Sequence, residues 1–108
     1  MTVTKRRDAR EKLAGRVHDW AARMEVRVRA VTIRKMRRKW ASCSTAGRLT
    51  FDESLLSKSR ELQDYVIVHE LLHVSVPNHG KLWKSLMRAY LGDYEALEAR
   101  LRRRSGPS

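Results

Sequence analysis

Hydrophobic residues recur at helical spacing near the start of the chain. Between residues 5 and 24 the apolar positions form one stripe on an otherwise charged segment, at Leu13, Val17, Trp20, Ala21 and Met24. Such spacings are typical of the buried face of an amphipathic helix. The basic N-terminal segment 1–24 is therefore predicted to contain a helix that packs on a core.

The pattern changes from helical spacing to alternation in the segment 25–52. Apolar residues alternate with charged ones in residues 25–30, which is the period of a half-buried strand. The phase then shifts by one residue at Val31 and Ile33, which predicts a bulge or a turn near residues 30–32.

Two short extended stretches follow in the same segment. Residues 39–44 and 48–51 are separated by a turn at Ser44-Thr-Ala-Gly47, which predicts a hairpin. The segment is therefore expected to form a small, mostly antiparallel sheet.

Helical periodicity returns in residues 59–92. Ser59 is a good N-cap, and the apolar face that follows continues to about Val74, after which Pro77 forbids further helix. A second apolar stripe lies at Leu82, Trp83, Leu86, Met87 and Tyr90. Two helices are thus predicted in this segment.

The end of the chain predicts one more helix. Gly92 is expected to end the second stripe, and Asp93 can cap a short helix over residues 94–103, within the C-terminal segment 93–104.

Three of the four histidines lie close together, at His69, His73 and His79. The first two, with Glu70, form the pattern H-E-x-x-H. Residues four apart on a helix project from the same face, so two imidazoles can converge on one ion. Zinc at such a site takes three protein ligands and a water, and a neighbouring carboxylate can accept the proton of that water as it attacks a carbonyl.

The context of the motif strengthens this interpretation. The surrounding run YVIVHELLHVSV should be a buried helix, where two histidines and a glutamate are costly without a partner. One metal ion satisfies all three, and His79, after the helix break, is the candidate third ligand. The alternative is a pair of core histidines with ordinary hydrogen bonds and His79 on the surface.

Cys43 is the one rival ligand. If its thiolate joined the three histidines, zinc would be four-coordinate and the site structural, without a catalytic water. A buried, inert thiol is the other interpretation of this residue.

Length and composition limit the class of protein. The 108 residues fit one domain, 1–108, and 42% hydrophobic residues predict a folded chain. The longest apolar runs are far shorter than the roughly 20 residues of a membrane span, and the charged N-terminus is unlike a secretory signal. With one cysteine the chain can form no intrachain disulfide. Together these observations predict a cytoplasmic protein without a membrane partner.

The net charge of +12 is unevenly distributed. Residues 1–48 carry 15 basic and 4 acidic residues, which suggests contact with nucleic acid or simply a solvated face. Arg37, Arg38 and Lys39 are candidate phosphate contacts, beside Trp40, which can stack on a base. The alternative function is therefore a basic nucleic-acid-binding module with a structural zinc site.

The runs KMRRKWASCSTAGRLTFDESLL and DYVIVHELLHVSVPNHGKLW resemble the YgjP-like zinc metallopeptidase domain and, more distantly, SprT-like proteases. The resemblance covers about residues 31–92. It implies one zinc ion held by His69, His73 and His79, with Glu70 as general base. It also implies that Trp40, Ser42 and Cys43 lie on a strand close to the motif helix, packed with Tyr65.

Together these observations predict an α+β, zincin-like minimal metalloprotease domain. Its small, mostly antiparallel sheet would carry the H-E-x-x-H helix, and further helices would close the metal site. The expected function is zinc-dependent hydrolysis of a peptide or protein substrate that lies extended along an edge strand. Trp40 and Ser42 are the candidate substrate contacts.

Overall fold

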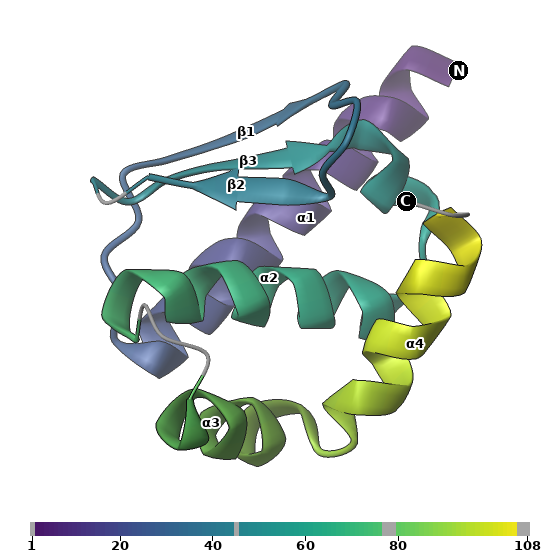
Figure 1. The fold of residues 1–108 in the computed structure, drawn as a ribbon. Helices are drawn as coiled ribbons and strands as arrows, with labels where there is room; N and C mark the ends of the chain where they lie inside the picture. Colours follow the sequence, from purple (N-terminus) through teal and green to yellow (C-terminus); the bar gives the residue numbers. More distant parts are fainter. Residues whose placement is uncertain (1, 45, 77–79, 106–108) are drawn as a thin grey trace.

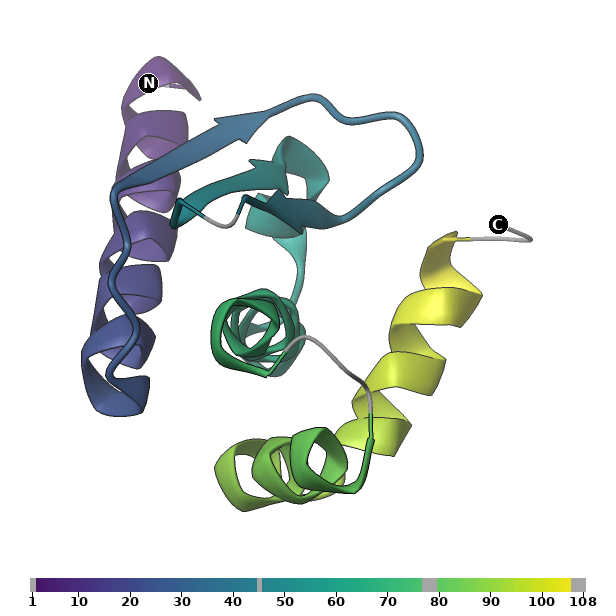
Figure 2. The same ribbon diagram turned by 60° about the vertical axis from the view of Figure 1, so that its left-hand side comes forward.

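A computed structural model describes residues 2–44, 46–76 and 80–105. The chain is organised around helix α2 (Arg60–Ser75), which carries the H-E-x-x-H motif (Figure 1). Viewed along this helix, α1 (Thr2–Met24) lies on one side and the sheet lies above it (Figure 2). Helices α3 (Lys81–Leu91) and α4 (Tyr94–Ser105) cover the remaining sides. The motif therefore lies on the central element of the fold.

The sheet has three strands in the order β1-β3-β2. Strand β2 (Ala41–Cys43) and strand β3 (Arg48–Asp52) form the predicted hairpin and pair antiparallel, with Ser42 opposite Thr50. Strand β1 (Ala30–Arg34) pairs with β3 in parallel. The expected mostly antiparallel sheet is therefore corrected to a mixed one.

The order of the strands explains the parallel pairing. The chain reverses direction between β1 and β2 and again in the hairpin, so β3 runs in the direction of β1 and lies beside it. In this register Val31 pairs with Leu49, and Ile33 pairs with Phe51. Paired residues project to the same side of a sheet, so the four side chains together face the core.

Of the residues 25–30 predicted as a strand, 25–29 form a turn and irregular chain in the structure, and the strand begins at Ala30. The bulge or turn predicted near residues 30–32 is wrong, because Ala30, Val31 and Thr32 pair with β3 in continuous register. The shift in phase marks the point where the irregular segment enters the sheet. There the Arg29 N–H donates to the carbonyl oxygen of Gly47 over 2.9 Å. A Cβ on Gly47, whose φ is +85°, would lie 2.6 Å from the Arg27 carbonyl oxygen, so the close approach requires glycine.

Helix α1 is fixed to α2 by apolar and polar contacts. Leu13 and Val17 are fully buried, as their helical spacing predicted. The Arg16 guanidinium forms an ion pair with Asp64 of α2, and the Trp20 Nε1–H donates to the same carboxylate over 2.9 Å. These contacts hold the start of α2 against α1.

The helix boundaries follow the capping signals of the sequence. The Ser59 hydroxyl accepts a hydrogen bond from the Leu62 amide at the start of α2. Gly92 ends α3 with φ +72°, and Asp93 accepts from the Ala96 amide in the first turn of α4. A short 3₁₀ helix, η1 (Glu53–Ser57), lies in the connection that precedes α2. In the described part of the chain, every helix is too short or too polar to cross a bilayer.

Candidate active site

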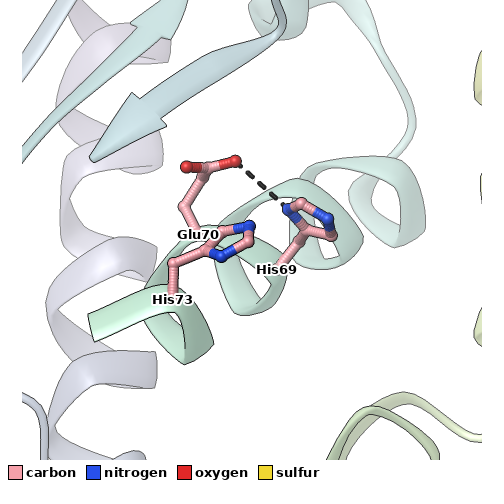
Figure 3. A group of neighbouring side chains, drawn as sticks. All are labelled: His69, Glu70 and His73. Carbon is pink, nitrogen blue, oxygen red and sulfur yellow. Dashed lines mark hydrogen bonds and ion pairs between the residues drawn. The ribbon is translucent and has the colours of Figure 1, made fainter. Parts of the chain in front are cut away.

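Helix α2 brings His69, Glu70 and His73 together on its half-buried side (Figure 3). The two histidines are one helical turn apart, and their ring centroids are 4.7 Å from each other. The Nδ1 atom of His69 lies 3.2 Å from Oε2 of Glu70. One nitrogen or oxygen from each of the three side chains can be chosen so that all lie within 4.8 Å of one another. This is the convergence that the spacing predicted.

The rest of α2 is buried and fixes the orientation of these side chains. Ile67, Val68 and Leu71 are fully inaccessible to solvent, and Leu72 is 2% exposed. Core packing at this density leaves little freedom for the helix to rotate. The motif side chains are therefore held on one side of a helix whose other sides are packed.

Aromatic rings surround His69. The Trp83 ring of α3 meets it edge-on at a centroid distance of 5.3 Å, and Tyr65, one turn earlier on α2, lies at 5.7 Å. Tyr94 of α4 in turn packs edge-on against Trp83. Helices α3 and α4 thus contribute apolar walls to the site.

The three side chains are chemically suited to a transition metal ion. Imidazole nitrogens and carboxylate oxygens are both common zinc ligands, and zinc binds them at about 2 Å. Ligand atoms of a tetrahedral zinc ion are about 3.3 Å apart at this bond length, and the donor atoms of these three side chains lie within 4.8 Å of one another. The predicted third ligand, His79, lies outside the described residues, which omit 77–79.

A cavity of about 250 Å³ opens beside His69 and Glu70. One wall is formed by Ala41, the first residue of β2, and by Trp40, which precedes it. The other lining residues come from α2 and α4, namely Tyr65, Val66, Glu98, Leu101 and Arg102. Trp40, predicted as a substrate contact, lies against this cavity together with Tyr65, whereas Ser42 is half-buried on β2 and is not among the lining residues.

Cys43 lies at the end of β2, and its thiol donates to the carbonyl oxygen of Ser44 over 3.3 Å. Burial raises the pKa of this thiol, and the negative charge of Glu70 raises it further. The neutral thiol is therefore favoured over the thiolate. Among the described residues, the convergent group consists of the two histidines and Glu70, without Cys43.

The basic residues Arg37, Arg38 and Lys39 lie in the connection between β1 and β2 and are exposed. Their connection is held by Asp52, whose Oδ1 accepts the Met36 amide over 2.7 Å. The backbone N–H of Asp52 also donates to the carbonyl oxygen of Trp40. The described residues that line the cavity beside His69 and Glu70 do not include these three side chains.

Asp52 is buried yet favours its charged form. Burial acts to raise the pKa of its carboxyl group, but hydrogen bonds from the Ser54 side chain and from the amides of Met36, Ser54 and Glu53 outweigh it. The pKa is therefore lowered from its ordinary value of 3.8.

Sequence reasoning missed the contribution of α4. The Tyr65 hydroxyl donates to Oε2 of Glu98 over 3.0 Å, and Oε1 of Glu98 lies 3.5 Å from the Arg102 guanidinium. Burial raises the pKa of the Tyr65 phenol, and the acceptor Glu98 raises it further. Glu98 and Arg102 are four residues apart, a spacing that predicts an ion pair on a helix but says nothing of a cavity.

Comparison with known proteins adds the following. The family model described as YgjP-like, metallopeptidase domain matches residues 2–104. The crystal structure of the metallopeptidase zymogen jannalysin of Methanocaldococcus jannaschii has a TM-score of 0.74 at 23% identity, over 82% of this chain and 92% of its own. That of the zymogen abylysin of Pyrococcus abyssi has a TM-score of 0.64 at 24% identity, over 84% and 90%. No curated protein matches the chain. These likenesses confirm the predicted α+β, metallopeptidase-like fold.

Proposed function

The chain belongs to the YgjP-like metallopeptidase family and is a hydrolase, and from this premise we propose how it cleaves peptide bonds. The proposed cofactor is one zinc ion, held by His69, His73 and His79, and the proposed general base is Glu70. The observation that carries the proposal is the convergence of two imidazoles and a carboxylate on one turn of α2.

The metal-binding part rests on the chemistry of the donors. Imidazole is a preferred ligand for zinc, and two of them at positions i and i+4 of a packed helix are already oriented. When bound, zinc polarises a substrate carbonyl and lowers the pKa of a water molecule to near neutral. A catalytic zinc site also needs an open position beside its ligands, and the cavity next to His69 could provide the space for it.

Glu70 is proposed to move the proton. It is next to His69 in sequence, and its carboxylate oxygen lies 3.2 Å from that ring. It also lines the cavity that a substrate would enter. The carboxylate accepts a proton from the attacking water and then delivers it to the leaving amine, which is general base and general acid catalysis by one group.

The substrate is proposed to be a peptide or protein segment in extended conformation. Among the described residues β2 pairs with β3 alone, so its other edge is open to a further strand. A peptide added to such an edge forms main-chain hydrogen bonds, with alternate side chains directed to either face. Trp40 and Ser42 belong to this end of the sheet and are proposed substrate contacts.

Metal analysis of the purified protein tests the proposal. We expect one zinc ion per chain in the wild type and loss of that ion in His73→Ala and in His79→Ala. His18→Ala is the matched control, because His18 is exposed on α1, remote in sequence from the motif, and its loss should leave the zinc content unchanged. Retention of the zinc ion by both ligand variants would refute the three-histidine site.

A further inference from the structure

The cavity beside the motif has the size of a pocket for one side chain. Its volume of about 250 Å³ is below the range of about 300–1,000 Å³ that is usual for pockets holding drug-sized ligands. His69 and Glu70 lie on one of its sides and α4 lies on another. Figure 2 shows α4 on the side of α2 that is remote from α1. A side chain adjacent to a scissile bond at the motif can therefore enter it.

The lining of the cavity combines apolar and charged surface. Trp40, Val66 and Leu101 provide apolar surface. The carboxylate of Glu98, with 35% of its side chain exposed, provides a charged acceptor on α4. Such a combination accommodates a long aliphatic stem that ends in a charged group.

The position of Glu98 is fixed by Tyr65, whose buried hydroxyl donates to Oε2 over 3.0 Å. Among the described residues, the partner of its other oxygen, Oε1, is a weak one on the same helix. Arg102 lies at 3.5 Å with 77% of its side chain exposed, and exposed pairs of this kind contribute little free energy. Glu98 thus keeps capacity to accept a hydrogen bond from a cation brought by a ligand.

The charges of the lining select among possible side chains. Glu70 and Glu98 are acidic, and Arg102, the one basic residue among the described lining residues, has 77% of its side chain exposed. An acidic side chain would meet like charge, whereas an apolar one would remove water from the Glu98 carboxylate without replacing its hydrogen bonds. A cation satisfies the carboxylate and can also contact the face of an aromatic wall, as Lys58 does at 5.2 Å from the Trp40 ring centroid.

We propose that this cavity is the specificity pocket of the enzyme and that it receives a lysine or arginine side chain next to the scissile bond, paired with Glu98. The inference rests on the proposed function, since the cavity is a substrate pocket only if Glu70 and the histidines act on peptides. Tyr65 is a positioning residue in this arrangement, because it acts through Glu98.

The experiment uses three peptides of glycine, alanine and serine that differ at one central residue, which is lysine, methionine or glutamate. With the zinc-loaded wild type we expect cleavage beside the lysine, mapped by mass spectrometry, and the order lysine, methionine, glutamate in kcat/KM. A charged hydrogen bond contributes about 1.5–3 kcal/mol, so lysine should exceed methionine by about 10-fold to 100-fold.

Variants of α4 locate the preference. Glu98→Gln should reduce the lysine-to-methionine ratio in kcat/KM by at least about tenfold, and Tyr65→Phe should reduce this ratio less. Glu95→Gln is the matched control, because Glu95 lies on the same helix but pairs with Arg88 at an exposed site. The lysine-to-methionine ratio of Glu95→Gln should equal that of the wild type.

A binding measurement separates this inference from the proposed function. Fluorescence anisotropy measures how tightly labelled peptides bind to the Glu70→Gln protein and to the Glu70→Gln, Glu98→Gln double variant. Cleavage does not interfere with this measurement, because both proteins lack the proposed general base. Tighter binding of the lysine peptide that depends on Glu98 supports the pocket even if the wild type cleaves none of the peptides, a result that would refute the proposed function alone. Equal binding of the three peptides, or a lysine preference that survives Glu98→Gln, overturns the pocket.

Discussion

Residues 69–73 of α2 and residues 37–39 between β1 and β2 both concentrate polar side chains, and the fold places them differently. His69, Glu70 and His73 of α2 are half-buried and converge on one another, and His69 and Glu70 border a cavity. The side chains of Arg37, Arg38 and Lys39 are exposed, in a connection that Asp52 fixes through the Met36 amide. One segment is supported by the core and the other by a single buried carboxylate.

The difference shows which property of a polar cluster indicates chemistry. Removing polar groups from water is costly, so a sequence keeps them on a packed helix only where something compensates. Exposed basic residues carry no such cost and are common on protein surfaces. Burial and convergence, more than the number of charges, therefore favour α2 as the candidate site. The following predictions test this contrast, from the largest expected effect to the smallest.

The largest effect is expected from Glu70→Gln. The substitution keeps the shape of the side chain but removes the carboxylate that is proposed to accept the proton, so kcat should fall by about 10²–10⁴-fold. Steady-state cleavage of a quenched fluorescent peptide measures this loss, with zinc content determined in parallel. Full activity in a zinc-loaded Glu70→Gln protein would contradict the proposed role of Glu70. The polar residues of α2 would then have no more support as catalytic groups than those of the basic connection.

Leu71→Ala tests whether the core beneath the motif supports it. Leu71 is fully buried between the two histidines in sequence, and its truncation should lower the free energy of unfolding by about 2–5 kcal/mol. Val74→Ala on the same helix is the control, because Val74 is 36% exposed and should cost less than about 1 kcal/mol. Urea denaturation followed by circular dichroism distinguishes them, and equal losses would contradict the packing described for α2.

Asp52→Asn tests the carboxylate that fixes the basic connection. Loss of the charged acceptor should lower the free energy of unfolding by about 1–3 kcal/mol at pH 7. The pKa of Asp52 is lowered in the folded state, so its contribution is complete above the ordinary pKa of 3.8 and is lost as the pH falls through the folded value. Denaturation at a series of pH values should show a weaker acid dependence in Asp52→Asn than in wild type. Identical acid dependence in the two proteins would contradict this role.

The smallest effect is expected from the combined variant Arg37→Ala, Arg38→Ala, Lys39→Ala. These side chains are exposed and separate from the motif, so kcat/KM for an uncharged peptide should stay within about twofold. Binding of a single-stranded oligonucleotide at several salt concentrations checks the alternative function. Tight, steeply salt-dependent binding that the triple variant loses would show that the connection has a function of its own.

The sequence was sufficient for features that depend on local chemistry. Ser59, Gly92 and Asp93 each predicted a helix boundary because capping depends on a few neighbouring residues. The convergence of His69 and His73 followed from helical geometry alone. Such features need no knowledge of the tertiary fold.

Features that depend on distant contacts were missed. The parallel pairing of β1 with β3 is decided by which strand lies in the middle of the sheet, and alternation of residues says nothing of that order. The assignment of residues 25–30 to a strand failed because their backbone meets Gly47 through one hydrogen bond at Arg29 instead of a regular ladder. The contact between Tyr65 and Glu98 joins residues 33 positions apart.

The central place of α2 also determines how the site responds to fluctuations. This helix contacts α1, β2, α3 and α4, so its backbone amides become accessible only when several layers separate. Amides protected by this many neighbours exchange with deuterium through global unfolding, whereas those at the end of α4 exchange through local fraying. The motif should therefore be among the last parts of the protein to exchange, and an agent that disorders it will have unfolded the molecule.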